Sequence, residues 1–141
     1  MDINSSHINI NKGNVQRIMK DLLTGKTSKH LITSDGWRTM ITDGVVPPIF
    51  MDTFADDLDW ELLVKFQKIP EELLEKYSNR LNWKLVCIHQ EMSEEFMINH
   101  QDKLSWKEVY YCQEYSDDFY KEFESHLKFY KDQTTLNKHS V

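Results

Sequence analysis

One pattern occurs three times along this chain of 141 residues, and it constrains the fold more than any other feature. The three segments read LDWELLVKFQKIPEEL from Leu58, LNWKLVCIHQEMSEEF from Leu81 and LSWKEVYYCQEYSDDF from Leu104, so each begins 23 residues after the one before. Repeats of this length are typical of solenoid proteins, in which a short repeat buries its apolar face only by stacking on its neighbours. The spacing therefore predicts a stack of small, similar repeats.

Four columns of the aligned repeats hold the same kind of residue in every copy. They comprise Leu58, Leu81, Leu104 and Leu127; Trp60, Trp83 and Trp106; Gln67, Gln90 and Gln113; and Leu73, Phe96 and Phe119. Trp60, Leu63 and Gln67 fall at i, i+3 and i+7, which places them on one face of a short helix. A glutamine on a buried face must be hydrogen-bonded, so we interpret the glutamines as structural. Their expected partners are backbone groups in the loops between helices, with the loop of the next repeat as one option. Because Trp83 stands in the central repeat, we expect it to be buried.

A second helix is predicted in each repeat, beginning at Pro70, Ser93 or Ser116. Ser is favoured at the N-cap, Pro at a helix start, and the two acidic residues that follow suit the positive end of the helix dipole. This helix should bury an apolar residue and, four positions later, a ring. These pairs are Leu73 and Tyr77, Phe96 and His100, and Phe119 and Phe123. Helices of about two turns are unstable alone in water, so we predict an all-α fold that is stabilised by stacking.

The pattern continues upstream in degenerate form over residues 35–57. Steps of 23 residues lead back from Trp60 to Trp37 and from Pro70 to Pro47. We therefore favour a helical first repeat here, since the terminal repeats of solenoids are commonly atypical. The alternative is a β-hairpin over residues 30–41 that turns at Asp35-Gly36.

The remaining segments are assigned around these repeats. A capping helix is expected to begin at Asn14 and to end at Gly25, with Ile18 and Leu22 facing inward. The predicted segments are an N-terminal tail and capping helix at 1–34, the degenerate repeat at 35–57, helical repeats at 58–130 and a frayed C-terminal tail at 131–141. The predicted architecture is a small α-solenoid of short helical hairpins, with about three regular repeats, a degenerate first repeat and an N-terminal capping helix.

Charge and composition restrict the classes of partner. The net charge is -6, and the stretch from Leu58 to His126 carries fifteen acidic and eight basic side chains. Phosphate contacts require Lys and Arg, so we expect no nucleic-acid binding but a protein partner, with a basic surface as one option. No apolar run is long enough for a membrane-spanning helix, so we expect no membrane binding. The sequence has no long apolar run and no secretory signal at its N-terminus, and its two cysteines are too few for a disulfide framework. We therefore expect a cytoplasmic protein.

The residues that could support metal binding or catalysis do not form known motifs. The potential metal ligands are Cys87, His89, His100, Cys112 and His126. Structural zinc sites use close pairs such as C-x2-C or H-x3-H, and no such pair is present. His100 shares its column with Tyr77 and Phe123, which indicates that the column requires bulk. No nucleophile motif occurs, so we expect no metal, no cofactor and no catalytic residue.

Two sets of residues are candidates for partner binding. The first is acidic: Glu72, Glu95 and Asp118 follow the predicted starts of the second helices, where they either contact a basic partner or only complement the helix dipole. The second is aromatic: Tyr110, Tyr111 and Tyr115 belong to a tyrosine-rich last repeat. Interface hot spots are enriched in Tyr, but terminal repeats also need rings that close the stack. Both interpretations stay open for each set.

The pattern of Leu-x-Trp, a Gln seven residues after the Trp and then Ser-Glu-Glu-Phe resembles the short Trp-anchored helical repeats found in proteins of large DNA viruses and bacteriophages. The resemblance covers Leu58 to Leu127 well and 35–57 poorly. It implies a viral or phage accessory protein that acts in the host cytoplasm, and it transfers no defined chemistry. We expect a non-enzymatic protein-interaction module that binds and inhibits a host protein, such as a defence factor. The alternatives are an enzyme or enzyme subunit with its site in residues 14–57, and a structural protein that assembles end to end.

Overall fold

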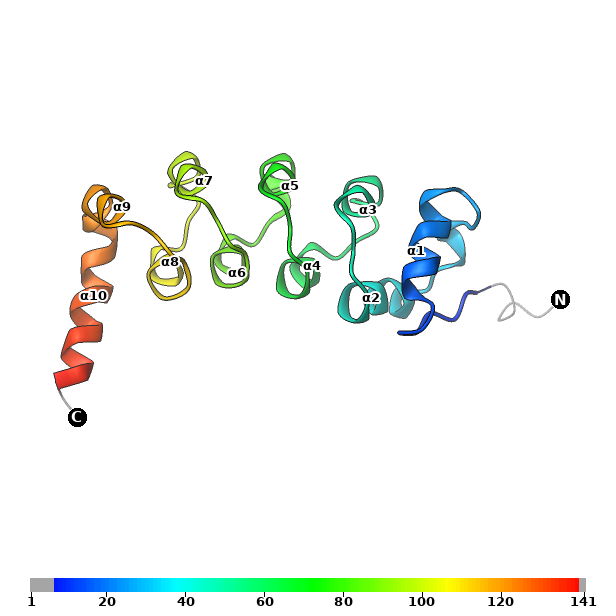
Figure 1. Ribbon diagram of the computed structural model, residues 1–141, viewed down its shortest axis with the longest axis horizontal. Coiled ribbons are helices and arrows are strands. Elements are labelled where there is room, and N and C mark those ends of the chain that lie inside the picture. The colour runs from blue at the N-terminus through cyan, green and yellow to red at the C-terminus, as the bar shows by residue number, and fades with distance from the viewer. Residues whose placement is uncertain (1–6, 140–141) are drawn as a thin grey trace. The chain divides into compact units, whose positions relative to one another are not determined.

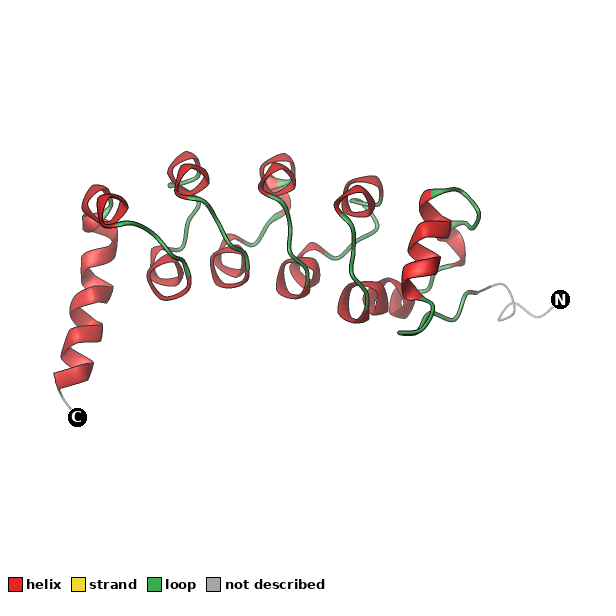
Figure 2. Ribbon diagram, in the orientation of Figure 1, coloured by secondary structure: helices red, strands yellow, loops and turns green. Residues whose placement is uncertain are grey.

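The computed structural model describes residues 7–139, with side chains described as far as Leu136. Every regular element in this part of the chain is a helix, as Figure 2 shows, so the predicted all-α fold is confirmed. The chain divides into two compact units, Met1–Leu81 and Asn82–Val141, which we call the N-terminal unit and the C-terminal unit. The boundary between them falls inside the segment 58–130 that we assigned to the regular repeats.

The N-terminal unit consists of a capping helix followed by two helical pairs (Figure 1). Its elements are α1 (Val15–Leu23), the 3-10 helix η2 (Lys29–Leu31), α2 (Ser34–Asp43), α3 (Pro48–Thr53), α4 (Trp60–Phe66), α5 (Glu71–Lys76) and the 3-10 helix η3 (Ser78–Arg80). Helix α1 packs on α2 and α3, and α2 packs on α4. Ile18 and Leu22 of α1 are buried, as predicted. Gly25, just beyond this helix, has a φ of 76°, a left-handed conformation that glycine adopts readily.

The C-terminal unit consists of two helical pairs and a longer last helix (Figure 1). Its elements are α6 (Trp83–His89), α7 (Glu94–Asn99), α8 (Trp106–Cys112), α9 (Asp117–Glu122) and α10 (Glu124–His139). Helix α8 packs on α6, and α10 packs on α8 and α9. Helix α10 therefore extends through residues for which we expected a frayed tail.

The second helices begin at the positions that their N-cap serines predict. The Ser93 hydroxyl accepts a hydrogen bond from the Phe96 N–H at 3.1 Å, and the Ser116 hydroxyl accepts one from the Phe119 N–H at 3.2 Å. Thr33 caps α2 by accepting from the Gly36 N–H at 3.0 Å. Helix α2 thus passes through the point where the alternative hairpin would turn, and the hairpin interpretation of residues 30–41 is wrong.

The most deeply buried column lies one helical turn after the tryptophans. It comprises Met40, Leu63, Val86 and Val109, each with 0% of its surface exposed. Of the tryptophans only Trp60 is buried, and Trp83 is partly exposed, so the expectation that Trp83 is buried is wrong. Each indole packs on a ring of its own repeat, such as Trp60 on Tyr77 at 4.8 Å and Trp83 on His100 at 5.2 Å. The Trp60 Nε1 also donates a buried hydrogen bond, to the Ala55 carbonyl at 2.9 Å.

The second helices bury most of the predicted side chains. Phe96, His100, Phe119 and Phe123 are all buried. In α5, however, Leu73 is partly exposed and the adjacent Leu74 is fully buried, which corrects the prediction for that repeat. Tyr77 is also only partly buried, because its hydroxyl donates a hydrogen bond to the Asp52 carboxylate at the surface.

Glutamine side chains join consecutive helical pairs within each unit. In the N-terminal unit, the Gln67 Nε2 donates to the carbonyls of Ile41 and Gly44 at 2.7 and 2.8 Å, and its Oε1 accepts from the Val46 N–H at 2.9 Å. Gln67 thereby ties α4 to the end of α2 and to the loop that follows it.

The C-terminal unit contains the same arrangement. The Gln113 Nε2 donates to the carbonyls of Cys87 and Gln90 at 2.8 and 2.6 Å, and its Oε1 accepts from the Met92 N–H at 3.1 Å. Both glutamines reach back by 26, 23 and 21 residues to their three partners. The predicted structural role is confirmed for Gln67 and Gln113, but their partners belong to the preceding repeat and not to the next one.

Candidate functional site

The acidic candidates lie at helix starts, on the surface. Glu72 is exposed in the first turn of α5 in the N-terminal unit, and Glu95 and Asp118 are exposed in the first turns of α7 and α9 in the C-terminal unit. Glu94, the neighbour of Glu95, has a structural role, since its carboxylate accepts hydrogen bonds from the Ser116 hydroxyl at 2.7 Å and the Ser116 N–H at 3.3 Å. One carboxylate of this pair therefore supports the next helix start, and the other faces solvent.

The aromatic candidates are brought together only in part. Tyr110 and Tyr111 of α8 are in edge contact at 5.0 Å, and Tyr130 of α10 lies 6.3 and 6.4 Å from them. Phe129 meets Tyr130 edge-on at 5.3 Å. We call these four residues the aromatic surface. Tyr111 and Phe129 are 52% and 63% exposed, so the surface keeps two large rings in water.

Tyr115 makes no ring contact with the aromatic surface among the described residues. It packs on Phe119 at 5.3 Å and is partly buried. Burial raises the pKa of its hydroxyl, and the phenols of Tyr110 and Tyr120 act in the same direction. Of the three predicted tyrosines, Tyr110 and Tyr111 therefore lie together, whereas Tyr115 lies apart from them, just before α9.

Two exposed apolar residues of α10 were missed as candidates. Phe129 and Leu136 lie 23 residues after Trp106 and Gln113, so they occupy the Trp and Gln columns of a fourth repeat. Leu136 is 62% exposed. The sequence shows Leu127 and Phe129 as the start of a fourth Leu-x-aromatic step, but Phe129 was not proposed as a binding residue, and Leu136 fell in the segment 131–141 that we expected to be a frayed tail.

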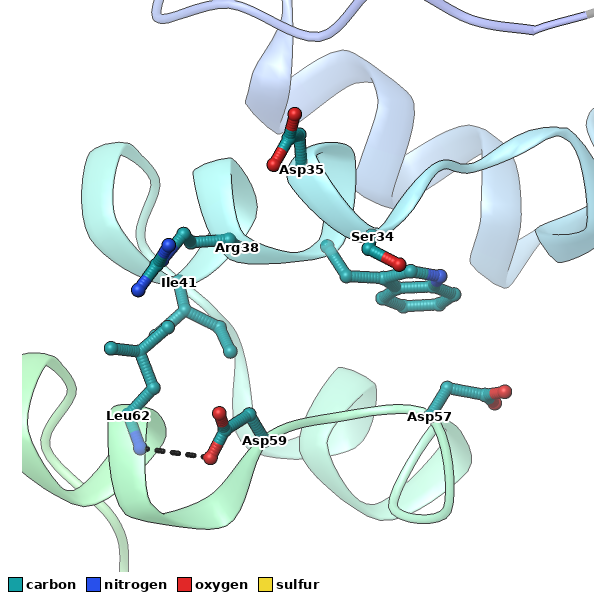
Figure 3. Close-up of a pocket in the computed structure, with 8 residues that line it drawn as sticks. Ser34, Asp35, Arg38, Ile41, Asp57, Asp59 and Leu62 are labelled. Carbon is teal, nitrogen blue, oxygen red and sulfur yellow. Dashed lines mark hydrogen bonds between the residues drawn. The ribbon is translucent and has the colours of Figure 1, made fainter.

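A groove in the N-terminal unit lies between α2 and the segment that leads into α4 (Figure 3). Its volume is about 320 Å³. It is lined by Ser34, Asp35, Trp37, Arg38, Ile41, Asp57, Asp59 and Leu62. Most of this lining falls in residues 14–57, where the enzymatic alternative places its site.

The polar groups of the groove are largely engaged in structural contacts. Asp59 caps α4 by accepting from the Leu62 N–H at 3.2 Å, and Asp57 forms an ion pair with Lys29 at 3.3 Å. Within the described residues, no hydrogen bond joins the Ser34 hydroxyl to a carboxylate of the groove. A nucleophile needs a base within hydrogen-bond reach, so the groove offers polar surface but no assembled nucleophile and base.

The cysteines and histidines have packing roles or lie on the surface. In the part of the chain that the structure describes, no group of three or more His, Cys, Asp or Glu side chains is arranged to hold a metal ion. The His100 ring contacts Phe96 at 4.4 Å, which agrees with a column that requires bulk. No described helix has the length and apolar character needed to cross a bilayer.

The two thiols are expected to differ strongly in reactivity. Burial raises the pKa of the Cys87 thiol to about 11, whereas Cys112 is exposed. The thiolate is the reactive form, and a raised pKa keeps Cys87 protonated until the pH approaches that value. At pH 8 a disulfide reagent such as DTNB should therefore modify Cys112 at least tenfold faster than Cys87. Equal rates in the native protein would contradict this burial, and Cys112→Ser should remove the fast phase.

Comparison with protein-family models, with curated proteins and with solved structures found no match for this chain.

Proposed function

We propose that the chain is a non-enzymatic protein-binding module that contacts its partner through the aromatic surface on α8 and α10. The observation that carries this proposal is the exposure of Tyr111 and Phe129 within one cluster of rings. Buried aromatic residues dominate binding energy at protein interfaces. A partner that covers these two rings would remove a large apolar area from water.

The exposure of the rings supports a binding surface over a simple cap. A ring that closes the end of a stack is covered by the helix that it supports, as Phe119 and Phe123 are at 2% and 5% exposure. Tyr111 and Phe129 instead keep more than half of their surface in water. Their arrangement favours recognition of a further surface over closure of this one.

The exposed carboxylates would act as a second, weaker contribution to binding. Glu95 and Asp118 belong to the same unit as the aromatic surface. Charges at the edge of an interface mainly accelerate association with an oppositely charged partner. The resemblance of the repeats to those of viruses and phages supports a host protein as the partner, with sequestration or inhibition in the host cytoplasm as the outcome.

A capture experiment tests the proposal. The full chain is immobilised and exposed to host extract, and the captured protein is then titrated against the variant Tyr111→Ser/Phe129→Ser. Affinity should fall at least tenfold, because truncation of interface hot-spot rings typically costs about 2 kcal/mol or more. Phe66→Ser is the matched control, since Phe66 is 56% exposed in the N-terminal unit and should not affect capture. Unchanged affinity of the double variant would contradict the proposal.

A charge variant separates the two candidate surfaces in the same assay. Replacement of Glu72 and Glu95 by Gln and of Asp118 by Asn removes three charges and keeps the helix starts polar. If a basic partner meets these carboxylates, association should slow at low salt and the effect should shrink near 1 M salt, where the Debye length is about 3 Å. An unchanged association rate at low salt would assign these residues to the helix starts alone.

A further inference from the structure

The two glutamine contacts define a three-point hydrogen-bonding set in the backbone. Each set consists of two carbonyls at the end of a first helix and one N–H in the following loop. The sets are Ile41 O, Gly44 O and Val46 N–H for Gln67, and Cys87 O, Gln90 O and Met92 N–H for Gln113. A primary carboxamide satisfies all three groups, because it offers two N–H donors and one acceptor oxygen.

A third copy of this set lies at the end of α8. Steps of 23 residues from Cys87, Gln90 and Met92 lead to the Tyr110 carbonyl, the Gln113 carbonyl and the Tyr115 N–H. Helices α6 and α8 have the same length of seven residues, and each ends at a glutamine C-cap.

The backbone conformation at the end of α8 also matches that at the end of α6. The φ and ψ angles are -106° and 142° at Gln90, and -103° and 150° at Gln113. The following N-caps agree as well, with -68° and 158° at Ser93 and -78° and 166° at Ser116. The third set therefore has the same backbone geometry as the set of Cys87, Gln90 and Met92, which holds the Gln113 carboxamide.

No side chain described in the structure, as far as Leu136, satisfies this third set. The residue at the corresponding repeat position is Leu136, which cannot hydrogen-bond through its side chain and is 62% exposed. Among the side chains that the structure describes, from residue 7 to residue 136, none donates to the Tyr110 or Gln113 carbonyl or accepts from the Tyr115 N–H, and no backbone group does so either. All three residues are partly exposed, and Tyr111 and Cys112 beside them are exposed. Water satisfies backbone groups at partly exposed positions, and a ligand whose polar atoms match all three groups would replace that water.

We propose that the third set binds a primary carboxamide, presented as a glutamine side chain by a partner protein. This proposal rests on the proposed function and specifies the chemistry of the partner at the same surface, because Tyr110 belongs to both. A carboxylate would meet two carbonyl oxygens without a donor, and an ammonium or guanidinium group would leave the Tyr115 N–H without an acceptor. Because α10 already packs on α8, the glutamine is expected on an extended segment of the partner and not on a stacked helix.

Hydrogen exchange of the free, full-length protein gives the first test. Met92 and Tyr115 are equivalent positions, but only the Met92 N–H donates to a glutamine oxygen. The Tyr115 N–H should therefore exchange at least tenfold faster than the Met92 N–H in native conditions. If Tyr115 is protected as strongly as Met92, another group already satisfies the set and the inference fails.

Titration with a peptide gives the second test, read from the backbone amide resonances of the full-length protein. The probe is VKFQKIP, residues 64–70 of this chain, with acetyl and N-methylamide ends so that its glutamine is the only primary carboxamide. Binding should shift the Tyr115 amide resonance and slow its exchange, while the Met92 amide stays unchanged. The peptide with Gln67→Leu should bind at least tenfold more weakly, because three hydrogen bonds are lost.

The outcomes separate this inference from the proposed function. Equal binding of the two peptides, or binding of neither at millimolar concentration, would overturn the carboxamide site. If both peptides bind equally and Tyr111→Ser weakens both, the aromatic surface binds partners without a carboxamide, and the proposed function stands alone. Loss of partner capture in Phe66→Ser but not in the aromatic variants would instead overturn the proposed function.

Discussion

Phe50→Ala should lower the free energy of unfolding by about 3 to 5 kcal/mol, a large part of the stability of a domain of this size. Phe50 is 0% exposed, and its ring contacts Phe54 at 4.6 Å and Trp37 at 6.2 Å. Truncation removes a buried ring and leaves a cavity that the short helices around it can fill only in part. Urea unfolding, followed by circular dichroism, measures the change.

Phe66→Ala is the matched control for this truncation. The same side chain is removed from the same unit, but Phe66 is 56% exposed, so the loss should stay under about 1 kcal/mol. A loss of under about 1 kcal/mol for Phe50→Ala as well would contradict the burial of Phe50 in the core.

Gln113→Leu should destabilise the C-terminal unit by about 2 to 4 kcal/mol, and Gln67→Leu should have a similar effect on the N-terminal unit. Leucine keeps the apolar bulk but leaves two carbonyls and one N–H without their partner. Gln113→Glu should destabilise the unit at least as much as Gln113→Leu does, because a carboxylate would face the carbonyls of Cys87 and Gln90 without a proton to donate. Thermal and urea unfolding of the purified variants measure both effects.

Gln133→Leu is the control for the glutamine variants. Gln133 is exposed on α10, and its replacement should change stability by no more than about 0.5 kcal/mol. A comparable loss in Gln133→Leu and Gln113→Leu would mean that the effect comes from the added apolar surface and not from the hydrogen bonds.

Much of the fold could be predicted because the repeat compares the chain with itself. The constant spacing of Trp, Gln and the Ser or Pro at the second helix indicated where each helix begins, and the structure confirms these starts. The structural role of Gln113 followed from its place on a buried face. Which neighbouring repeat Gln113 contacts could not be predicted, because in a regular stack the preceding and the following loop are equivalent in sequence.

The errors have local physical causes. Leu73 and Leu74 are adjacent on a helix of six residues, and a small rotation about its axis decides which of them is buried. Trp83 and Trp60 both stand at the first position of a helix, so the sequence pattern did not distinguish the partly exposed Trp83 from the buried Trp60. The length of α10 was missed because we expected the polar segment TTLNKHSV at its end to fray. In the structure, the Thr134 and Thr135 hydroxyls donate to the carbonyls four residues earlier, at 2.9 and 3.1 Å.

The candidate site could be predicted only in part. Tyr110 and Tyr111 were identified from the tyrosine density of the last repeat, and the structure places them together. Phe129 could have been found from its place in the Trp column, whereas its exposure depends on α10 continuing past the last helical pair. The third hydrogen-bonding set is made of backbone groups, so no side-chain motif could indicate it.

Hydrogen exchange of the two glutamine variants shows whether a glutamine carboxamide satisfies the same backbone set in each unit. Gln67→Leu should increase the exchange rate of the Val46 amide and leave Met92 unchanged, and Gln113→Leu should do the reverse. Each affected amide should exchange at least tenfold faster at a pH and temperature where the variants remain folded. Retained protection of Val46 in the first variant and of Met92 in the second would show that the glutamines do not hold these backbone groups.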